Sequence, residues 1–112
     1  MEQDLAEKMG FIRGEDIGKN IIGAPGILEA ALDALNQRAA IRDKPNGERS
    51  ALKAANILSA WTGREWAEED VWRCLLATKM ARESQGAFHA DDCIDGAGYF
   101  ALLGECRSIN EI

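Results

Sequence analysis

The stretch that decides the fold is EEDVWRCLLATKMAR, residues 68–82. Its apolar residues recur three or four positions apart: Val71, Trp72, Leu75, Leu76 and Met80. This spacing places them on one face of an α-helix. Three acidic residues open the stretch, where the partial positive charge of a helix N-terminus favours them. The pattern predicts a helix that begins near Trp66 or Ala67 and stops at about Gly86.

Three more helices are predicted around this one. Upstream, apolar residues at helical spacing follow Ala24-Pro25-Gly26 and predict a helix from about Gly26 to Ile41. The polar, breaker-rich residues 42–47 predict a loop. Ser50 is placed to cap the next helix, which ends at Thr62-Gly63. Its apolar stripe comprises Ala54, Ile57, Leu58 and Trp61.

The last predicted helix begins at His89 or Asp91 and runs to about Cys106. Gly96 and Gly98 interrupt its helix propensity, at about 1 kcal/mol each relative to alanine. We therefore expect another helix to pack closely against them. The sequence predicts an all-α fold, a small bundle of about four helices over residues 25–112. Residues 1–24, which hold four glycines, are predicted to form an irregular N-terminal leader.

Size, charge and cysteine usage narrow the class of protein. A chain of 112 residues fits one domain. The net charge of −6 argues against a protein that coats duplex nucleic acid, because phosphate neutralisation needs a surplus of lysine and arginine. No apolar run approaches the roughly 20 residues that span a bilayer, and the acidic start does not resemble a signal peptide. Three widely spaced cysteines and one histidine form no zinc pattern, so we expect reduced thiols and a cytoplasmic location.

The densest group of chemically active side chains straddles the connection between the last two helices. Lys79 and Arg82 lie one turn apart on the first of them. Five further residues stand on or before the second helix, all near the same end of an antiparallel hairpin: His89, Asp91, Asp92, Asp95 and, one turn later, Tyr99. Carboxylates of this kind could bind Mg²⁺, which keeps waters for a phosphate-bearing substrate. Lysine and arginine would hold the phosphates.

A second group, weaker in signal, lies at the entry to the helix after the predicted loop. Glu48 is a candidate metal ligand and Arg49 a candidate phosphate ligand, beside the free N–H groups of a helix start. A solvated turn with an ordinary cap explains the same residues. The three tryptophans could stack a nucleobase, although core and hinge packing is the simpler explanation for at least two of them.

A purely structural explanation also fits the main group. Acidic residues at a helix start cap it and complement its dipole. Pairs such as Lys79 with Asp95, or Arg82 with Asp91, would tie two helices together. His89 fits a loop or capping position as well as a general base. Both interpretations stay open from the residues alone.

Residues 47–105 resemble a widespread family of small phage and prophage proteins of unknown function. The matching residues are Gly47-Glu48-Arg49-Ser50, Thr62-Gly63-Arg64, Trp72, Lys79, Arg82, His89-Ala90-Asp91, Asp95, Tyr99 and Ala101-Leu102-Leu103 through Glu105. The leader and the first predicted helix lie outside this match. The sequence departs from the family at Ala51, where methionine is usual, at Asp92, where serine is usual, and at Ile94, where an acid is usual.

A more distant resemblance is to MazG-type all-α nucleotide pyrophosphohydrolases, which hold magnesium between an E-x-x-E helix and an E-x-x-D helix. Asp92-Cys93-Ile94-Asp95 is similar to the second element. Lys79-Met80-Ala81-Arg82 stands where the first would be, and it is basic. The resemblance therefore implies phosphate binding more readily than hydrolysis.

Together these observations predict a phage-type helical protein that binds a nucleotide or another phosphorylated small molecule, with MazG-like pyrophosphohydrolysis as an extension. The alternative is a non-catalytic oligomeric interaction module whose charged cluster is structural. From its size and apolar content we expect a homo-oligomer, a dimer, in the cytoplasm of a phage or prophage host, without membrane contact.

Overall fold

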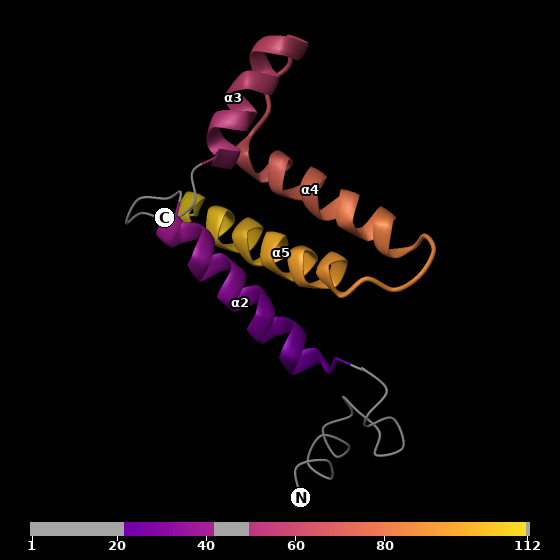
Figure 1. The fold of residues 1–112 in the computed structure, drawn as a ribbon. Helices are drawn as coiled ribbons and strands as arrows, with labels where there is room; N and C mark the ends of the chain where they lie inside the picture. Colours follow the sequence, from indigo (N-terminus) through magenta and orange to yellow (C-terminus); the bar gives the residue numbers. More distant parts are fainter. Residues whose placement is uncertain (1–21, 42–49, 112) are drawn as a thin grey trace, which may run out of the picture.

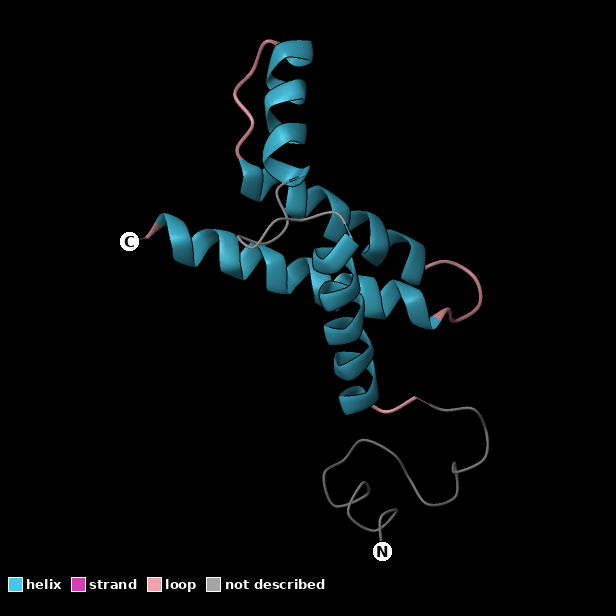
Figure 2. Ribbon diagram, turned by 60° about the vertical axis from the view of Figure 1, so that its left-hand side comes forward, coloured by secondary structure: helices cyan, strands magenta, loops and turns pink. Residues whose placement is uncertain are grey.

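The computed structural model describes residues 22–41 and 50–111. These residues form four helices: α2 (Ala24–Ile41), α3 (Ser50–Thr62), α4 (Glu68–Glu83) and α5 (Ala90–Asn110) (Figure 1). Over the described ranges there is no strand, as Figure 2 shows. The prediction of a small all-α bundle is confirmed. The predicted leader up to residue 21 and the predicted loop lie outside the described residues.

The helices are arranged around α5. Helices α4 and α5 run antiparallel side by side, α2 crosses another side of α5, and α3 packs against α4. The end of α3 at Thr62 projects farthest from α5 (Figure 1). Because α3 contacts the start of α4 through one side only, much of its surface faces outward.

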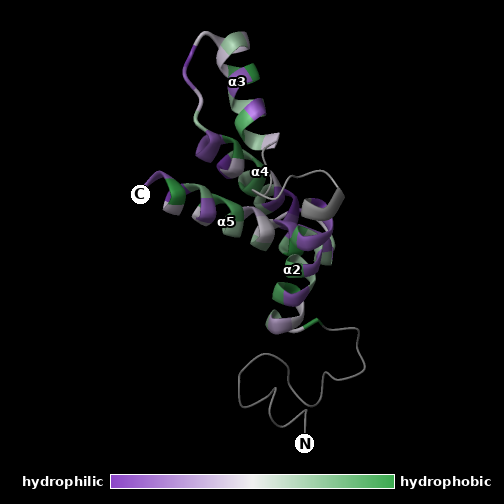
Figure 3. Ribbon diagram, turned by 90° about the vertical axis from the view of Figure 1, so that its left-hand side faces the viewer, coloured by the Kyte–Doolittle hydropathy of each residue, from purple (hydrophilic) through white to green (hydrophobic). Residues whose placement is uncertain are grey.

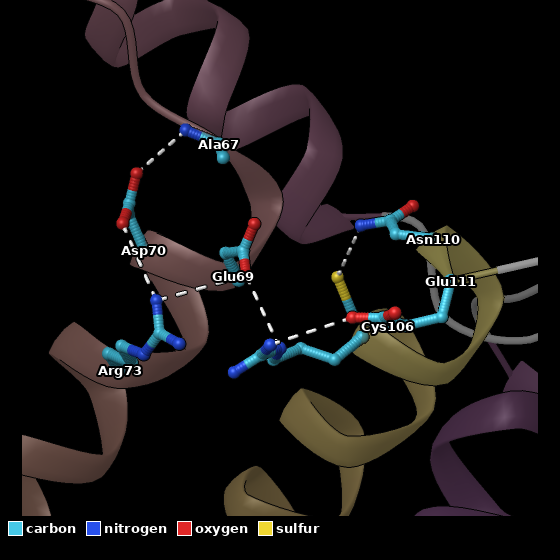
Figure 4. Close-up of polar contacts among 8 residues, drawn as sticks. Ala67, Glu69, Asp70, Arg73, Cys106, Asn110 and Glu111 are labelled. Carbon is cyan, nitrogen blue, oxygen red and sulfur yellow. Dashed lines mark hydrogen bonds and ion pairs between the residues drawn. The ribbon is translucent and has the colours of Figure 1, made fainter.

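Glycines and one carboxylate set the helix ends. Gly63 has φ of 71° and Gly86 has φ of 69°, a left-handed backbone that glycine adopts without strain, so the chain turns after α3 and after α4. At the start of α4, the Ala67 N–H donates to Asp70 Oδ2 at 2.8 Å (Figure 4). The predicted helices match except that α5 continues to Asn110, four residues past the expected end.

The two glycines of α5 lie where other helices approach. A Cβ at Gly96 would sit 3.6 Å from Leu76 Cδ1, and one at Gly98 would sit 3.8 Å from Leu35 Cδ2. Leu76 belongs to α4 and Leu35 to α2, so each glycine faces a different neighbouring helix. The expectation of close packing at Gly96 and Gly98 is confirmed.

The core is small and lies where α3, α4 and α5 meet. Trp72 is its largest member and is only 2% exposed. Its ring lies 6.1 Å from the Tyr99 ring, and its Nε1 donates to Glu68 Oε2 at 3.2 Å. The other buried members are Ala51, Ala55, Val71, Leu102, Leu103 and Cys106. Burial in this apolar setting raises the pKa of the Cys106 thiol.

Several apolar residues of the predicted helical stripes are exposed. Trp61 is 80% exposed and Ile57 is 50% exposed on α3, and Met80 is 62% exposed on α4. Their helical spacing is as predicted, but none of the other described helices covers that side of α3 or α4. Figure 3 shows green hydrophobic turns along α3, interrupted by purple hydrophilic ones and ending in a pale turn at its projecting end. None of the described helices is long and apolar enough to cross a membrane.

Candidate functional site

The predicted charged group assembles at the end of the α4–α5 hairpin. Lys79 Nζ lies 2.9 Å from Asp95 Oδ2 and 4.0 Å from carboxylate oxygens of both Asp91 and Asp92. Arg82 Nε lies 3.6 Å from Asp92 Oδ1. The antiparallel hairpin explains this arrangement, because the last turns of α4 lie beside the first turns of α5. These five residues are called the hairpin cluster below.

Burial differs sharply within the hairpin cluster. The Asp92 side chain is 3% exposed and that of Lys79 is 13% exposed. Arg82 and Asp91 are open to solvent, at 60% and 64%. The buried Asp92 Oδ1 has ion-pair neighbours but accepts no hydrogen bond from any described residue. A buried carboxylate oxygen of this kind is destabilising unless a donor or cation reaches it.

Lys79 is the electrostatic centre of the hairpin cluster. A hydrogen bond to Asp95 raises the pKa of the Lys79 ammonium, and the negative charges of Asp95 and Asp91 act in the same direction. Partial burial and the neighbouring Arg82 oppose this shift. Because two cations face three carboxylates, the cluster carries one net negative charge. Its cations are therefore already matched by the protein's own acids.

The other predicted ligand residues do not join the hairpin cluster. The Tyr99 ring lies tilted against Trp72, with ring centroids 6.1 Å apart, and the Arg38 guanidinium lies 5.9 Å from the Tyr99 ring centroid. The ring is thus part of the packing between α2, α4 and α5. His89 occupies the cap position of α5, as one interpretation expected, and its exposed side chain makes no capping hydrogen bond. Glu48 and Arg49 lie outside the described residues.

The hairpin cluster is not arranged as a metal centre. Across residues 22–41 and 50–111, no group of three or more histidine, cysteine, aspartate or glutamate side chains is placed to hold a metal ion. The Lys79 ammonium approaches Asp91, Asp92 and Asp95 at the distances given above, where a divalent cation would have to bind. Magnesium binding through these three aspartates and Glu48 stays a prediction.

Sequence reasoning gave little weight to the corner between α3 and α4. An open hollow of about 540 Å³ is lined there by Asn56, Ser59, Gly63, Arg64, Glu65, Trp66 and Ala67. Trp66 holds the corner, since its backbone N–H donates to Ser59 Oγ at 2.9 Å and its Nε1 donates to Thr62 Oγ1 at 3.1 Å. The Arg64 guanidinium lies 5.8 Å from the Trp66 ring centroid. The sequence signal for this corner was the motif Thr62-Gly63-Arg64 followed by Trp66.

A second set of ion pairs links the opposite ends of α4 and α5. Glu69 Oε2 lies 3.8 Å from both Arg73 Nη1 and Arg107 Nε, and Asp70 also pairs with Arg73 (Figure 4). These side chains are about a third to a half exposed, and such pairs stabilise by about 0–1 kcal/mol each. The antiparallel hairpin is therefore held by ion pairs near both ends, and the hairpin cluster is the more buried of the two sets.

Comparison with known proteins gives a family but no activity. No curated protein and no solved structure is significantly similar to the chain. A family model described as a domain of unknown function, DUF6378, matches residues 26–107. This match takes in most of α2 and so extends beyond residues 47–105, to which the predicted resemblance to phage and prophage proteins was confined. Because the match covers most of the chain, the protein belongs to the DUF6378 family.

Proposed function

We propose that this protein is a non-catalytic helical interaction module in which the hairpin cluster stabilises the fold. The observation that carries the proposal is the exposure of large apolar side chains. Ten of them are more than a third exposed in the described residues: Leu28, Leu32, Leu52, Ile57, Trp61, Leu75, Met80, Phe88, Phe100 and Ile109. Apolar surface that a small domain leaves in water is characteristic of protein–protein contact sites.

The hairpin cluster supports the non-catalytic part of this proposal. Lys79 is mostly buried and is engaged by Asp95 at 2.9 Å, so its ammonium already has an anionic partner inside the protein. A phosphate entering the cluster would meet three carboxylates along with the two cations. Like-charge repulsion of this kind opposes anion binding.

A screen of nucleotides by thermal shift, with and without Mg²⁺, tests the proposal. A ligand at 100 times its Kd stabilises a protein by about 2.7 kcal/mol, which raises the melting temperature readably. The interaction module predicts no shift with ATP, GTP, their diphosphates or inorganic pyrophosphate. A shift that disappears in Arg82→Ala but persists in the matched surface variant Arg73→Ala would overturn it.

A second candidate function is binding of a nucleotide or another phosphorylated small molecule, in the cytoplasm of a phage or prophage host. One specific observation favours it: the buried Asp92 Oδ1 accepts no hydrogen bond, while the neighbouring Arg82 is 60% exposed. An incoming Mg²⁺ or a ligand hydrogen-bond donor would bind this oxygen, and the Arg82 guanidinium would form a bidentate contact with a phosphate.

A test for catalysis distinguishes two forms of this second candidate, a protein that only binds nucleotides and one that hydrolyses them. A MazG-like pyrophosphohydrolase would release a nucleoside monophosphate and pyrophosphate from a triphosphate. Chromatography of a nucleotide mixture after incubation with protein and Mg²⁺ detects these products. Binding without products would establish a binder, and products absent in Asp95→Asn would establish an enzyme.

A further inference from the structure

The exposed side of α3 has a regular composition. Lys53, Ile57 and Trp61 follow one another at four-residue intervals, so they form a single ridge along the helix. All three are exposed, Trp61 at 80% and Ile57 at 50%. The opposite side of α3 carries Ala51 and Ala55, which are buried in the core against α4. The ridge therefore points away from the rest of the described chain.

The surroundings of this ridge are small and almost uncharged. Ala54 and Ala60 flank it, leaving grooves beside the larger side chains. Lys53 is the single charged residue of α3, although the chain as a whole carries a net charge of −6. Two copies that meet through most other surfaces bring acidic groups together. Within α3 itself, from Ser50 to Thr62, a like copy would meet no carboxylate.

We propose that a second copy of this chain docks on the Lys53–Ile57–Trp61 ridge. This inference rests on the proposed interaction function. In a two-fold arrangement each residue of the patch meets the same patch of the other copy. Antiparallel packing of α3 on α3 with Ile57 at the axis brings Lys53 opposite the partner's Trp61, because both lie four residues from the centre. An ammonium over an indole face is a favourable cation–π contact, and the symmetry supplies it twice.

The size of the ridge sets the expected strength of this contact. A helix of 13 residues is about 20 Å long at 1.5 Å per residue. Stable complexes bury about 800 Å² on each partner from about 20–30 residues, which one face of α3 does not provide alone. The dimer is therefore expected to be weak, with a Kd in the micromolar range or above.

Sedimentation equilibrium of the full chain from about 5 to 500 micromolar, the range that brackets a micromolar Kd, tests this assignment. The wild type should shift from monomer to dimer mass. Trp61→Ala should raise the dimer Kd at least about tenfold, since aromatic anchors dominate interfaces. Lys53→Glu should also raise it, because an anion faces the partner's Trp61 instead of a cation. Phe100→Ala, a change at another exposed aromatic residue on α5 (62% exposed), is the matched control and should leave the Kd unchanged.

Three outcomes would overturn the inference. The wild type could remain monomeric at every concentration, as it would if residues 1–21 of the same chain covered the ridge. Phe100→Ala could dissociate the dimer while Trp61→Ala does not, which would move the interface to α5. Assembly could also stop at a mass other than a dimer. None of these outcomes bears on the proposed function itself, which the nucleotide screen decides separately.

Discussion

The hairpin cluster and the α3 ridge show opposite solutions to surface exposure. At the hairpin cluster, the Lys79 side chain is 13% exposed and that of Asp92 is 3% exposed. Both are largely removed from water, and both lie in ion pairs with residues of the facing helix. On α3, a tryptophan that is 80% exposed has no covering helix among the described residues. In the hairpin cluster, charged side chains are buried where apolar ones are usual. On α3, a large apolar side chain is exposed to solvent. The first region is expected to govern folding stability and the second to govern association.

The tryptophans give the largest expected contrast between a folding region and an association region. Trp72→Ala should destabilise the fold by about 3–5 kcal/mol, the usual loss for a buried aromatic residue, because Trp72 is 2% exposed. Trp61→Ala should change the unfolding free energy of the dilute protein by less than about 0.5 kcal/mol. Urea denaturation monitored by circular dichroism measures both. Equal losses would show that α3 is covered in solution.

Lys79 provides the next largest effect. Lys79→Met keeps the length of the side chain but leaves Asp91, Asp92 and Asp95 without their shared cation. The loss should be about 2–4 kcal/mol, somewhat below the 3–5 kcal/mol of a fully buried pair, because two of the three carboxylates retain solvent contact. Arg82→Met is the control within the same cluster and should cost at most about 1 kcal/mol, since Arg82 is 60% exposed.

The same lysine predicts a dependence of stability on pH. Its pKa is raised in the folded state, so the folded protein holds this proton more tightly than the unfolded chain does. The contribution is fully present below the ordinary lysine pKa of about 10.4 and is lost as pH rises through the higher folded value. Unfolding free energies of the wild type and Lys79→Met should therefore converge above about pH 10.4. A constant difference up to pH 12 would contradict the role of the ammonium charge.

A smaller effect on the free energy of unfolding is expected at Gly104, a glycine against which no other described helix packs. A Cβ at Gly104 would meet nothing within 4 Å, in contrast to Gly96 and Gly98, which face other helices. Gly104→Ala should raise the unfolding free energy by about 0.5–1 kcal/mol, because alanine is the better helix former. A decrease measured by thermal unfolding would show that another chain or segment approaches α5 at this point.

Much of this fold could be predicted from residue spacing, because caps, glycines and apolar periodicity are local signals. Pro25 lies beside the start of α2 at Ala24, Gly63 directly follows the end of α3 at Thr62, and Gly86 comes three residues after the end of α4 at Glu83. Periodicity also showed that Lys79 and Asp95 lie near one end of a hairpin. It could not show which stripe is covered, since Ile57 and Trp61 have the helical spacing of a core face. Coverage depends on how helices cross, which is a property of the tertiary arrangement.

The chemistry of the hairpin cluster was less predictable than its location. The residue types in Lys79, Arg82 and the three aspartates suit a phosphate and metal site as well as a set of ion pairs. The structure supplies the missing quantities, which are the 2.9 Å contact of Lys79 with Asp95 and the burial of Asp92. The Tyr99 ring was assigned to the same site from a spacing of one turn, but it points toward Trp72 instead.

The most direct test of the structural role of the hairpin cluster is a double-mutant cycle between Lys79 and Asp95. Unfolding free energies are measured in urea for the wild type, Lys79→Met, Asp95→Asn and the double variant. Hydrogen bonds between charged groups contribute about 1.5–3 kcal/mol, and the cycle should return a coupling energy in that range. A coupling near zero, together with a nucleotide-dependent rise in melting temperature, would contradict the structural role and assign these residues to a ligand site.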